Sequence, residues 1–287
     1  MSGIALPAGL VGEGKRRRRW PVLVLCAMAW LGLMLGIALL ADAIAPYAYT
    51  ALDLRNRLSP PGATMLHPLG TDELGRDVLS RLIFSIRMSL LIAFGATIIG
   101  ALIGTSLGVV AAHFRGFVEQ VVLALVDFSA SLPFLILALA VLAFFGNSLT
   151  LFVCLLGLHA WERYARIARG LVISAGAQGY AAAVRQLGAS PWRIYGRHIL
   201  PNIASTLIVS MTLAFPEIIL LESGLSFLGL GVQPPETSLG SMVGYGREYL
   251  TRAPWILLSP AAVIVLTTFS VSVLGDWLRD RLDPTLQ

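Results

Sequence analysis

The feature that most constrains this chain is a succession of long apolar stretches that contain few charged residues. A helix that spans a bilayer needs about 20 consecutive, predominantly apolar residues. Stretches near that length occupy residues 21–41, 88–112, 118–146, 149–164, 203–221 and 255–274. Only 13% of the 287 residues are charged, whereas soluble domains carry about 25%, so almost no sequence remains for a soluble domain. We therefore expect an all-α, polytopic membrane protein with about six transmembrane helices.

The basic residues predict how these helices are oriented. A basic cluster at positions 15–19 precedes the first span, so residues 1–20 are expected to be cytoplasmic and residues 21–41 to form an uncleaved first helix. A signal peptide is disfavoured because its apolar region usually has only about 7–15 residues. Six crossings then return the tail, residues 279–287, to the cytoplasm. Residues 42–87 are expected outside, as loop and short helix, because four prolines interrupt them.

Two features of the spans predict how the helices are shaped and packed. Gly100, Gly104 and Gly108 recur every four residues, which places them on one face of the second span and lets another helix approach closely. Such a face favours helix contact over a pore lining. Pro133 interrupts the third span and is expected to kink it, because proline removes a backbone hydrogen bond.

The most informative polar segment is the predicted cytoplasmic loop, residues 166–202. Tyr180, Val184 and Leu187 have the spacing of an apolar stripe on a short helix. Gly188 follows this stripe and is expected to end the helix. The loop therefore contains folded structure that a simple connection between two spans does not need.

A second short helix is expected over residues 190–201. Its serine and Pro191 are typical of a helix start, and Trp192, Tyr195 and Ile199 are expected on one face. The result is a helix-glycine-helix hairpin. From spacing alone, a hairpin on anionic lipid headgroups and a docking element for a cytoplasmic partner are equally compatible with it.

Residues 180–202 resemble the EAA loop of importer-type ABC permeases, whose pattern is E-A-A-x-x-x-G-x(9)-I-x-L-P. The positions that match this pattern are Ala183, Gly188, Leu200 and Pro201. Three positions depart from it, since Ala182 replaces the glutamate, Val184 replaces the second alanine and His198 stands at the isoleucine position. The spacing of the motif is retained.

Three further stretches resemble the oligopeptide, dipeptide and nickel branch of these permeases. The stretch at residues 69–82 contains Gly70, Thr71, Asp72, Gly75, Arg76 and Asp77. The stretch at residues 222–235 contains Glu222, Gly229 and Gly231, and the third stretch covers residues 275–284. With a helix ahead of the first motif, the chain resembles the second, C-type permease of a pair, over residues 68–284.

The resemblance implies the type I ABC importer permease fold, with residues 88–278 as its transmembrane domain. It implies that the hairpin is a coupling helix seated in an ATPase subunit, through Tyr180, Ala182, Ala183, Val184, Leu187, Gly188, Arg193, Leu200 and Pro201. The implied partners are a second homologous permease subunit, two ATP-binding subunits, an external solute-binding protein and membrane lipid, without nucleic acid. ATP and magnesium are expected on the ATPase subunits, and no cofactor is expected in this chain.

The implied function is non-catalytic import of di- or oligopeptides across the bacterial cytoplasmic (inner) membrane, with nickel or another small solute as the alternative. Residues 9–15 imitate the start of a phosphate-binding loop, but Arg16 stands where serine or threonine is needed. Asp127 and Glu217 lie within spans and are candidate pathway residues. In a proton-coupled secondary transporter, the alternative of another class, they would form the proton relay.

Overall fold

The computed structural model describes residues 21–63 and 65–282, which are mainly helical and include one isolated bridge between Thr71 and Asp77. The long helices are α1 (Val22–Leu39), α3 (Val78–Phe114), α4 (Gly116–Ser131), α5 (Phe134–Phe145), α6 (Leu149–Gly176), α9 (Leu200–Phe227) and α11 (Trp255–Leu282). The short helices are α2 (Ala41–Ile44), α7 (Gly179–Gln186), α8 (Pro191–Ile194) and α10 (Leu239–Gly246), with 3-10 turns at Leu54–Asn56 and Arg247–Tyr249. The predicted cytoplasmic N-terminus, residues 1–20, lies outside the described residues.

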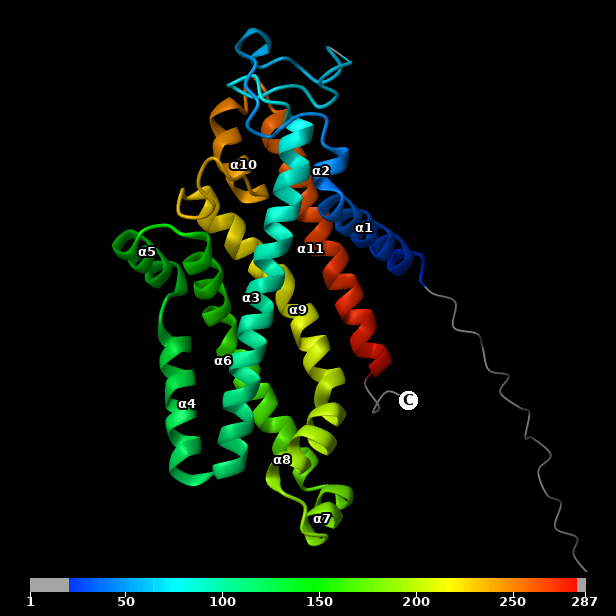
Figure 1. Cartoon of the computed structure of the whole chain (residues 1–287), viewed down its shortest axis with the longest axis vertical. Coiled ribbons are helices and arrows are strands. Elements are labelled where there is room, and N and C mark those ends of the chain that lie inside the picture. Colours follow the sequence, from blue (N-terminus) through cyan, green and yellow to red (C-terminus); the bar gives the residue numbers. More distant parts are fainter. Residues whose placement is uncertain (1–20, 64, 283–287) are drawn as a thin grey trace, which may run out of the picture.

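The long helices form an elongated bundle with loops and short helices at its two ends (Figure 1). The loops after α2 lie at one end together with α10, and α7 and α8 lie at the opposite end (Figure 1). Helix α11 packs beside α1. The indole Nε1 of Trp30 in α1 donates a 3.1 Å hydrogen bond to Oγ1 of Thr267 in α11. The predicted external segment and the predicted coupling hairpin thus emerge at opposite ends of the bundle, and their assignment to sides of a membrane stays a prediction.

Not every long helix is apolar. By length and composition, four described helices can cross a membrane, namely α1, α3, the continuous helix Pro191–Phe227 and α11. The bent pair of α4 and α5 supplies a fifth span if it crosses as one unit. The expected fourth crossing, α6, has 28 residues but is not among these apolar helices, and it carries Glu162, Arg163, Arg166 and Arg169. It is the polar helix of the bundle.

The second spanning helix, α3, begins ten residues earlier than the sequence predicts. Its first residue is Val78, and the carboxylate of Asp77 caps it by accepting a 2.7 Å hydrogen bond from the backbone N–H of Ser80. An aspartate in this position satisfies a backbone donor that the first turn leaves without an intrahelical partner. The predicted external segment, residues 42–87, therefore includes the first turns of α3, and its place outside the membrane stays a prediction.

Two further helix boundaries differ from the prediction. Helix α6 continues beyond Tyr164 to Gly176. The prediction that Pro201 ends the second hairpin helix is wrong, because Pro201 lies in the first turn of α9, where a missing N–H is tolerated. A π-helical turn, Tyr195–Ile199, joins α8 to α9 without a break. One helix therefore runs from the hairpin into the bundle.

The expected kink at Pro133 is a complete break. Helix α4 ends at Ser131, α5 begins at Phe134, and the two helices are bent by 87°. An N–H at the start of a helix has no intrahelical partner, so the missing N–H of Pro133 costs α5 no hydrogen bond. Near the break, the indole of Trp161 donates a 3.3 Å hydrogen bond to Oγ of Ser129, which ties α4 to α6.

The glycine face of α3 is a helix contact, as the sequence predicts. A Cβ added at Gly100 would lie 2.7 Å from the carbonyl oxygen of Gly157, and one added at Gly108 would lie 2.9 Å from Cβ of Ala168. Gly104 faces α6 between these two positions, where an added Cβ would lie 2.7 Å from Cβ of Tyr164. The missing side chains let the backbones of α3 and α6 approach closely, which strengthens dispersion contacts between them.

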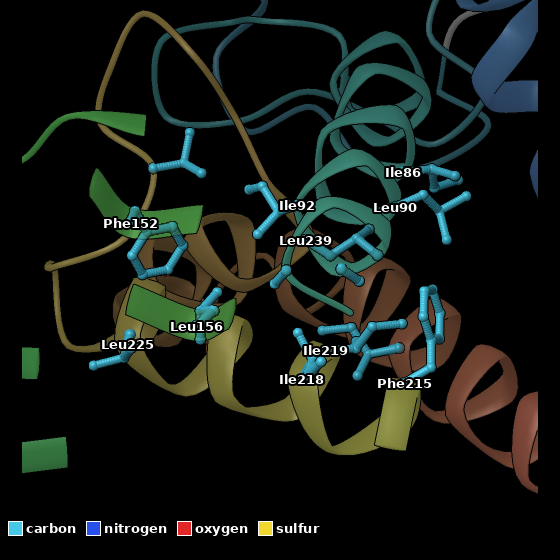
Figure 2. Packing of buried hydrophobic residues seen from close by; sticks show 14 of the residues in the cluster. Ile86, Leu90, Ile92, Phe152, Leu156, Phe215, Ile218, Ile219, Leu225 and Leu239 are labelled. Atoms are coloured by element: carbon cyan, nitrogen blue, oxygen red, sulfur yellow. The ribbon is translucent and has the colours of Figure 1, made fainter. Parts of the chain in front are cut away.

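The main apolar core lies where α3, α6, α9 and α10 meet (Figure 2). Its labelled members are Ile86, Leu90, Ile92, Phe152, Leu156, Phe215, Ile218, Ile219, Leu225 and Leu239. Lipid tails are as apolar as these side chains, so burial from water does not by itself hold spanning helices together. Close packing and the hydrogen bonds described below therefore determine the arrangement of the helices.

Candidate functional site: coupling hairpin, outer cap and polar face

The hairpin between α6 and α9 has the helix-glycine-helix form that the sequence predicts. Helix α7 contains the backbone of Ala183 and Val184, and Gly188 follows it with φ of +77°. The N–H of Ala189 donates a 3.3 Å hydrogen bond to the carbonyl of Val184, as in a Schellman motif. Glycine adopts this left-handed backbone without the steric penalty of other residues, so Gly188 sets the turn.

The inner side of the hairpin packs against those ends of α3 and α6 that are predicted to be cytoplasmic. Ile194 and Ile199 are 4% and 1% exposed and form one cluster with Ala112, Val172 and Ile203. They lie five residues apart, and the intervening π-helical turn keeps both on the same side. Trp192 is exposed and does not lie on this buried face. The expectation that Trp192 and Ile199 share one face is therefore wrong.

The tip of the hairpin presents apolar side chains to the outside. Leu187 and Trp192 are both 86% exposed, and Arg193 is exposed beside them. Val184 is half-buried against the inner cluster, so it is only partly available to a partner. Large exposed apolar groups at the end of a folded hairpin are typical of a surface that contacts another protein or a membrane.

The remaining predicted coupling residues occupy known positions in the hairpin. The backbone at positions 180 and 182 belongs to α7, while the side chains of Tyr180 and Ala182 lie outside the described part of the structure. Leu200 is half-buried and Pro201 is exposed in the first turn of α9. The participation of these residues in docking stays a prediction.

The motif at residues 69–82 forms a folded cap at the outer end of α3. The buried carboxylate of Asp72 accepts hydrogen bonds of 2.9 Å from the backbone N–H groups of Leu74 and Arg76. It also accepts one of 2.7 Å from Nε of Arg76 and one from Nη1 of Arg81. One aspartate therefore holds the turn and joins it to the first turn of α3.

Other members of the same motif fasten the cap to distant parts of the chain. The carbonyl of Thr71 accepts a 3.2 Å hydrogen bond from the indole of Trp255 at the start of α11. Gly70 and Gly75 have φ of +78° and +74°, which explains the glycines. Asp77 lies 3.0 Å from Nδ1 of His67 in addition to capping α3. These residues have a structural role at the end of the bundle where α3 begins.

Glu222 has a comparable structural position. Its side chain is fully buried and accepts hydrogen bonds of 3.1 Å from Ser89 and 2.9 Å from Ser226. Gly229 has φ of +81°, and a Cβ at Gly231 would lie 2.6 Å from Cα of Ser226. This second outer motif joins α9 to α3 and to α10.

A row of ion pairs connects α6 to its neighbours. Nη1 of Arg163 lies 2.7 Å from Oε2 of Glu217 in α9, and Nη2 of Arg166 lies 3.1 Å from Oδ1 of Asp127 in α4. Nε of Arg169 donates a 2.6 Å hydrogen bond to Glu119, also in α4. From the sequence these arginines are expected only as charges at the inner surface, because their spacing of three residues offers no information on their partners.

Part of this polar face is open in the single chain. The side chains of Asp127 and Glu217 are 74% and 43% exposed, and that of Arg166 is 46% exposed. Charged side chains within spans face a water-filled path or another protein surface and avoid hydrocarbon. The face formed by α4, α6 and α9 is therefore expected to border a water-filled path or another protein surface.

The fold and these surfaces define a polytopic helical permease with the type I fold of ABC importers. The fold is similar to a chain of the inward-facing MetNI methionine ABC transporter, with a TM-score of 0.60 and 20% sequence identity over 71% of this chain and 97% of that chain. A chain of an amino acid ABC transporter has a TM-score of 0.55 over 71% of this chain and 95% of its own length.

The chain belongs to the family of inner-membrane components of binding-protein-dependent transport systems, whose family model matches residues 104–287. The di/tripeptide transport system permease protein DppC of Pseudomonas aeruginosa is 38% identical, covering 87% of this chain and 84% of its own. The oligopeptide transport system permease protein OppC of Mycobacterium tuberculosis is 36% identical, covering 83% and 82%. The glutathione transport system permease protein GsiD of Pectobacterium atrosepticum is 34% identical, covering 89% and 84%.

Proposed function

We propose that this chain is a permease subunit of an ATP-driven importer of di- or oligopeptides in the bacterial cytoplasmic membrane. The observation that carries the proposal is the similarity to di/tripeptide and oligopeptide permeases over more than 80% of the chain. The same length of chain includes the outer cap and the hairpin, so the match is not restricted to the apolar spans. Nickel import is disfavoured because these relatives carry peptide names.

The hairpin is proposed to transmit the energy of ATP hydrolysis from an ATP-binding subunit to the helix bundle. Leu187 and Trp192 would bury their exposed side chains in a groove of an ATP-binding subunit, with Gly188 allowing close approach. The continuous helix Pro191–Phe227 would transmit a displacement of the hairpin into the bundle. Ala182 lacks the family glutamate, and we propose that exposed arginines such as Arg193, or a matched ATPase, compensate for it.

The other subunits follow from the same proposal. Two ATP-binding subunits would bind ATP and magnesium, and this chain would itself be non-catalytic. A second homologous permease would cover the open polar face of α4, α6 and α9. The outer cap, with the loops near α10, would receive a peptide-loaded binding protein.

Uptake in proteoliposomes tests the proposal. The chain would be reconstituted with a candidate second permease, ATP-binding subunits and a binding protein from the same organism, and labelled trialanine would be supplied with the binding protein. We expect uptake that requires ATP on the hairpin side and persists when a protonophore abolishes the proton gradient. Uptake driven by the proton gradient without ATP would contradict the proposal, as would transport of nickel but not of trialanine.

A further inference from the structure

Glu162, in the middle of the most polar helix, is half-buried and has one carboxylate oxygen without a partner. Glu162 is 13 residues from the start of α6 and 14 from its end, which corresponds to about 20 Å on each side. Its Oε2 is shielded and has no hydrogen-bond partner among the described residues. A carboxylate shielded from water is costly unless a cation or hydrogen-bond donor meets it. Among the described residues, no such group meets Oε2 of Glu162.

The neighbouring charges do not supply that group. Arg163 is the adjacent cation, but its guanidinium lies 2.7 Å from Glu217, and Nε2 of His159 lies 3.5 Å from the same carboxylate. We name His159, Glu162, Arg163 and Glu217 the midspan cluster. The midspan cluster contains two carboxylates and one guanidinium, and that guanidinium is paired with Glu217.

Glu162 borders two cavities. A cavity of about 170 Å³ lies at the break between α4 and α5 and is lined by Ser129, Phe134 and Trp161 among others. A cavity of about 70 Å³ lies between α6 and α9 and includes Glu217. Glu162 therefore borders space for a ligand group at the break between α4 and α5 and between α6 and α9.

The larger cavity has the chemistry of an ammonium site. The ring of Phe134 lies 4.2 Å from that of His159, and Trp161 contributes an indole to the same wall. Aromatic faces attract ammonium groups, and a carboxylate forms a charge-assisted hydrogen bond with them. A peptide with a free α-amino group is largely cationic at neutral pH, because the pKa of that group is about 8.

We infer that Glu162 binds the α-amino group of the peptide as it passes through the span, and that the aromatic wall of the larger cavity holds the adjoining residue. This inference rests on the proposed peptide importer. It assigns the chain its own recognition of the peptide N-terminus, in addition to any selection by a binding protein. A proton or a basic side chain of the second permease would be the competing source of positive charge.

Protection from thiol labelling tests the inference in the assembled transporter. Cys26 and Cys154 would be replaced by alanine and Ser129 by cysteine, so that a charged methanethiosulfonate reagent reports access to the larger cavity. We expect millimolar trialanine to slow labelling and N-acetyl-trialanine to do so only at about tenfold higher concentration, as for loss of one charge-assisted hydrogen bond. This comparison changes only the peptide, so it remains valid if variants at Glu162 fail to assemble.

Variants then locate the effect. Glu162→Gln should remove the difference between the two peptides, and Glu162→Asp should retain it. Asp280→Asn is the control, because Asp280 is an exposed carboxylate near the end of α11 and lines neither cavity. Equal protection by both peptides in the parent transporter, an unchanged difference in Glu162→Gln, or no labelling of the peptide-free cavity would overturn the inference. Trialanine uptake by the unmodified transporter reports the proposed function separately.

Discussion

The hydroxyl of Ser89 in α3 donates a 3.1 Å hydrogen bond to Oε2 of Glu222 in α9. The same hydroxyl accepts a 3.1 Å hydrogen bond from the backbone N–H of Leu239 at the start of α10. All three groups are buried, so no water competes for them. One serine thus connects three helices at the outer end, directly below the proposed docking region for a binding protein.

Ser89→Ala removes both hydrogen bonds and leaves a buried N–H and a buried carboxylate without one partner each. We expect a loss of about 1–3 kcal/mol in stability and faster amide exchange at Leu239. Thermal unfolding and hydrogen exchange in detergent would measure these effects. Ser272→Ala is the control, because the hydroxyl of Ser272 bonds only to a carbonyl of its own helix, Thr268. Unchanged exchange at Leu239 would show that Ser89 does not anchor α10.

The contact between α3 and α6 leaves no room for a side chain at Gly104. In Gly104→Ala the added methyl group meets Cβ of Tyr164 at 2.7 Å and forces the two helices apart. We expect about 1–3 kcal/mol of destabilisation from overpacking, seen as a lower thermal midpoint. Gly170→Ala in α6 is the matched control, because nothing lies within 4 Å of its added Cβ. Equal midpoints for the two variants would contradict the close contact.

The outer cap depends on the charge of Asp72. In Asp72→Asn the guanidinium of Arg81, which is 4% exposed, loses its buried counter-ion. Breaking a buried ion pair in this way costs about 3–5 kcal/mol, so the cap should become susceptible to proteolysis. Asp42→Asn breaks an exposed pair with Arg87 and should change stability by less than about 1 kcal/mol. Similar proteolysis of both variants would argue against a structural role of Asp72.

Substitutions at two glycines distinguish a docking role of the hairpin turn from the effect of backbone strain. Gly188 and Gly62 both have φ of +77° and open space where a side chain would project, but they lie in the hairpin and in the outer loops, respectively. Arginine at either position strains the backbone by about 1–2 kcal/mol. Gly188→Arg should also block docking and abolish ATP-driven uptake, whereas Gly62→Arg should retain most of it. Intact uptake in Gly188→Arg would exclude a docking role for this turn.

Much of the fold is predictable because local chemistry determines it. The glycine face of α3, the break at Pro133 and the turn at Gly188 each follow from the backbone preferences of one residue type. The motif at residues 69–82 is also visible in the sequence. Its structural reason is not, because the hydrogen bonds of Asp72 and Thr71 reach residues that are distant along the chain.

The polar face could not be predicted for the same reason. The sequence contains Arg163 and Arg166, but only the arrangement of three helices pairs them with Glu217 and Asp127. The unpaired oxygen of Glu162 is likewise a property of the assembled helices, since an isolated helix would expose it to water. Trp192 and Ile199 lie on different faces because a π-helical turn separates them, and the sequence offered no signal for that turn.

Cross-linking from the hairpin tip most directly tests whether this chain takes its energy from a separate ATPase. A photoreactive phenylalanine analogue would replace Trp192, whose side chain is 86% exposed, in the assembled transporter in lipid. We predict a covalent adduct with an ATP-binding subunit, and none from the same analogue at Leu66 in the outer loops, which is 65% exposed. Adducts of position 192 with lipid alone would contradict the account, because the hairpin would then lie on the membrane surface.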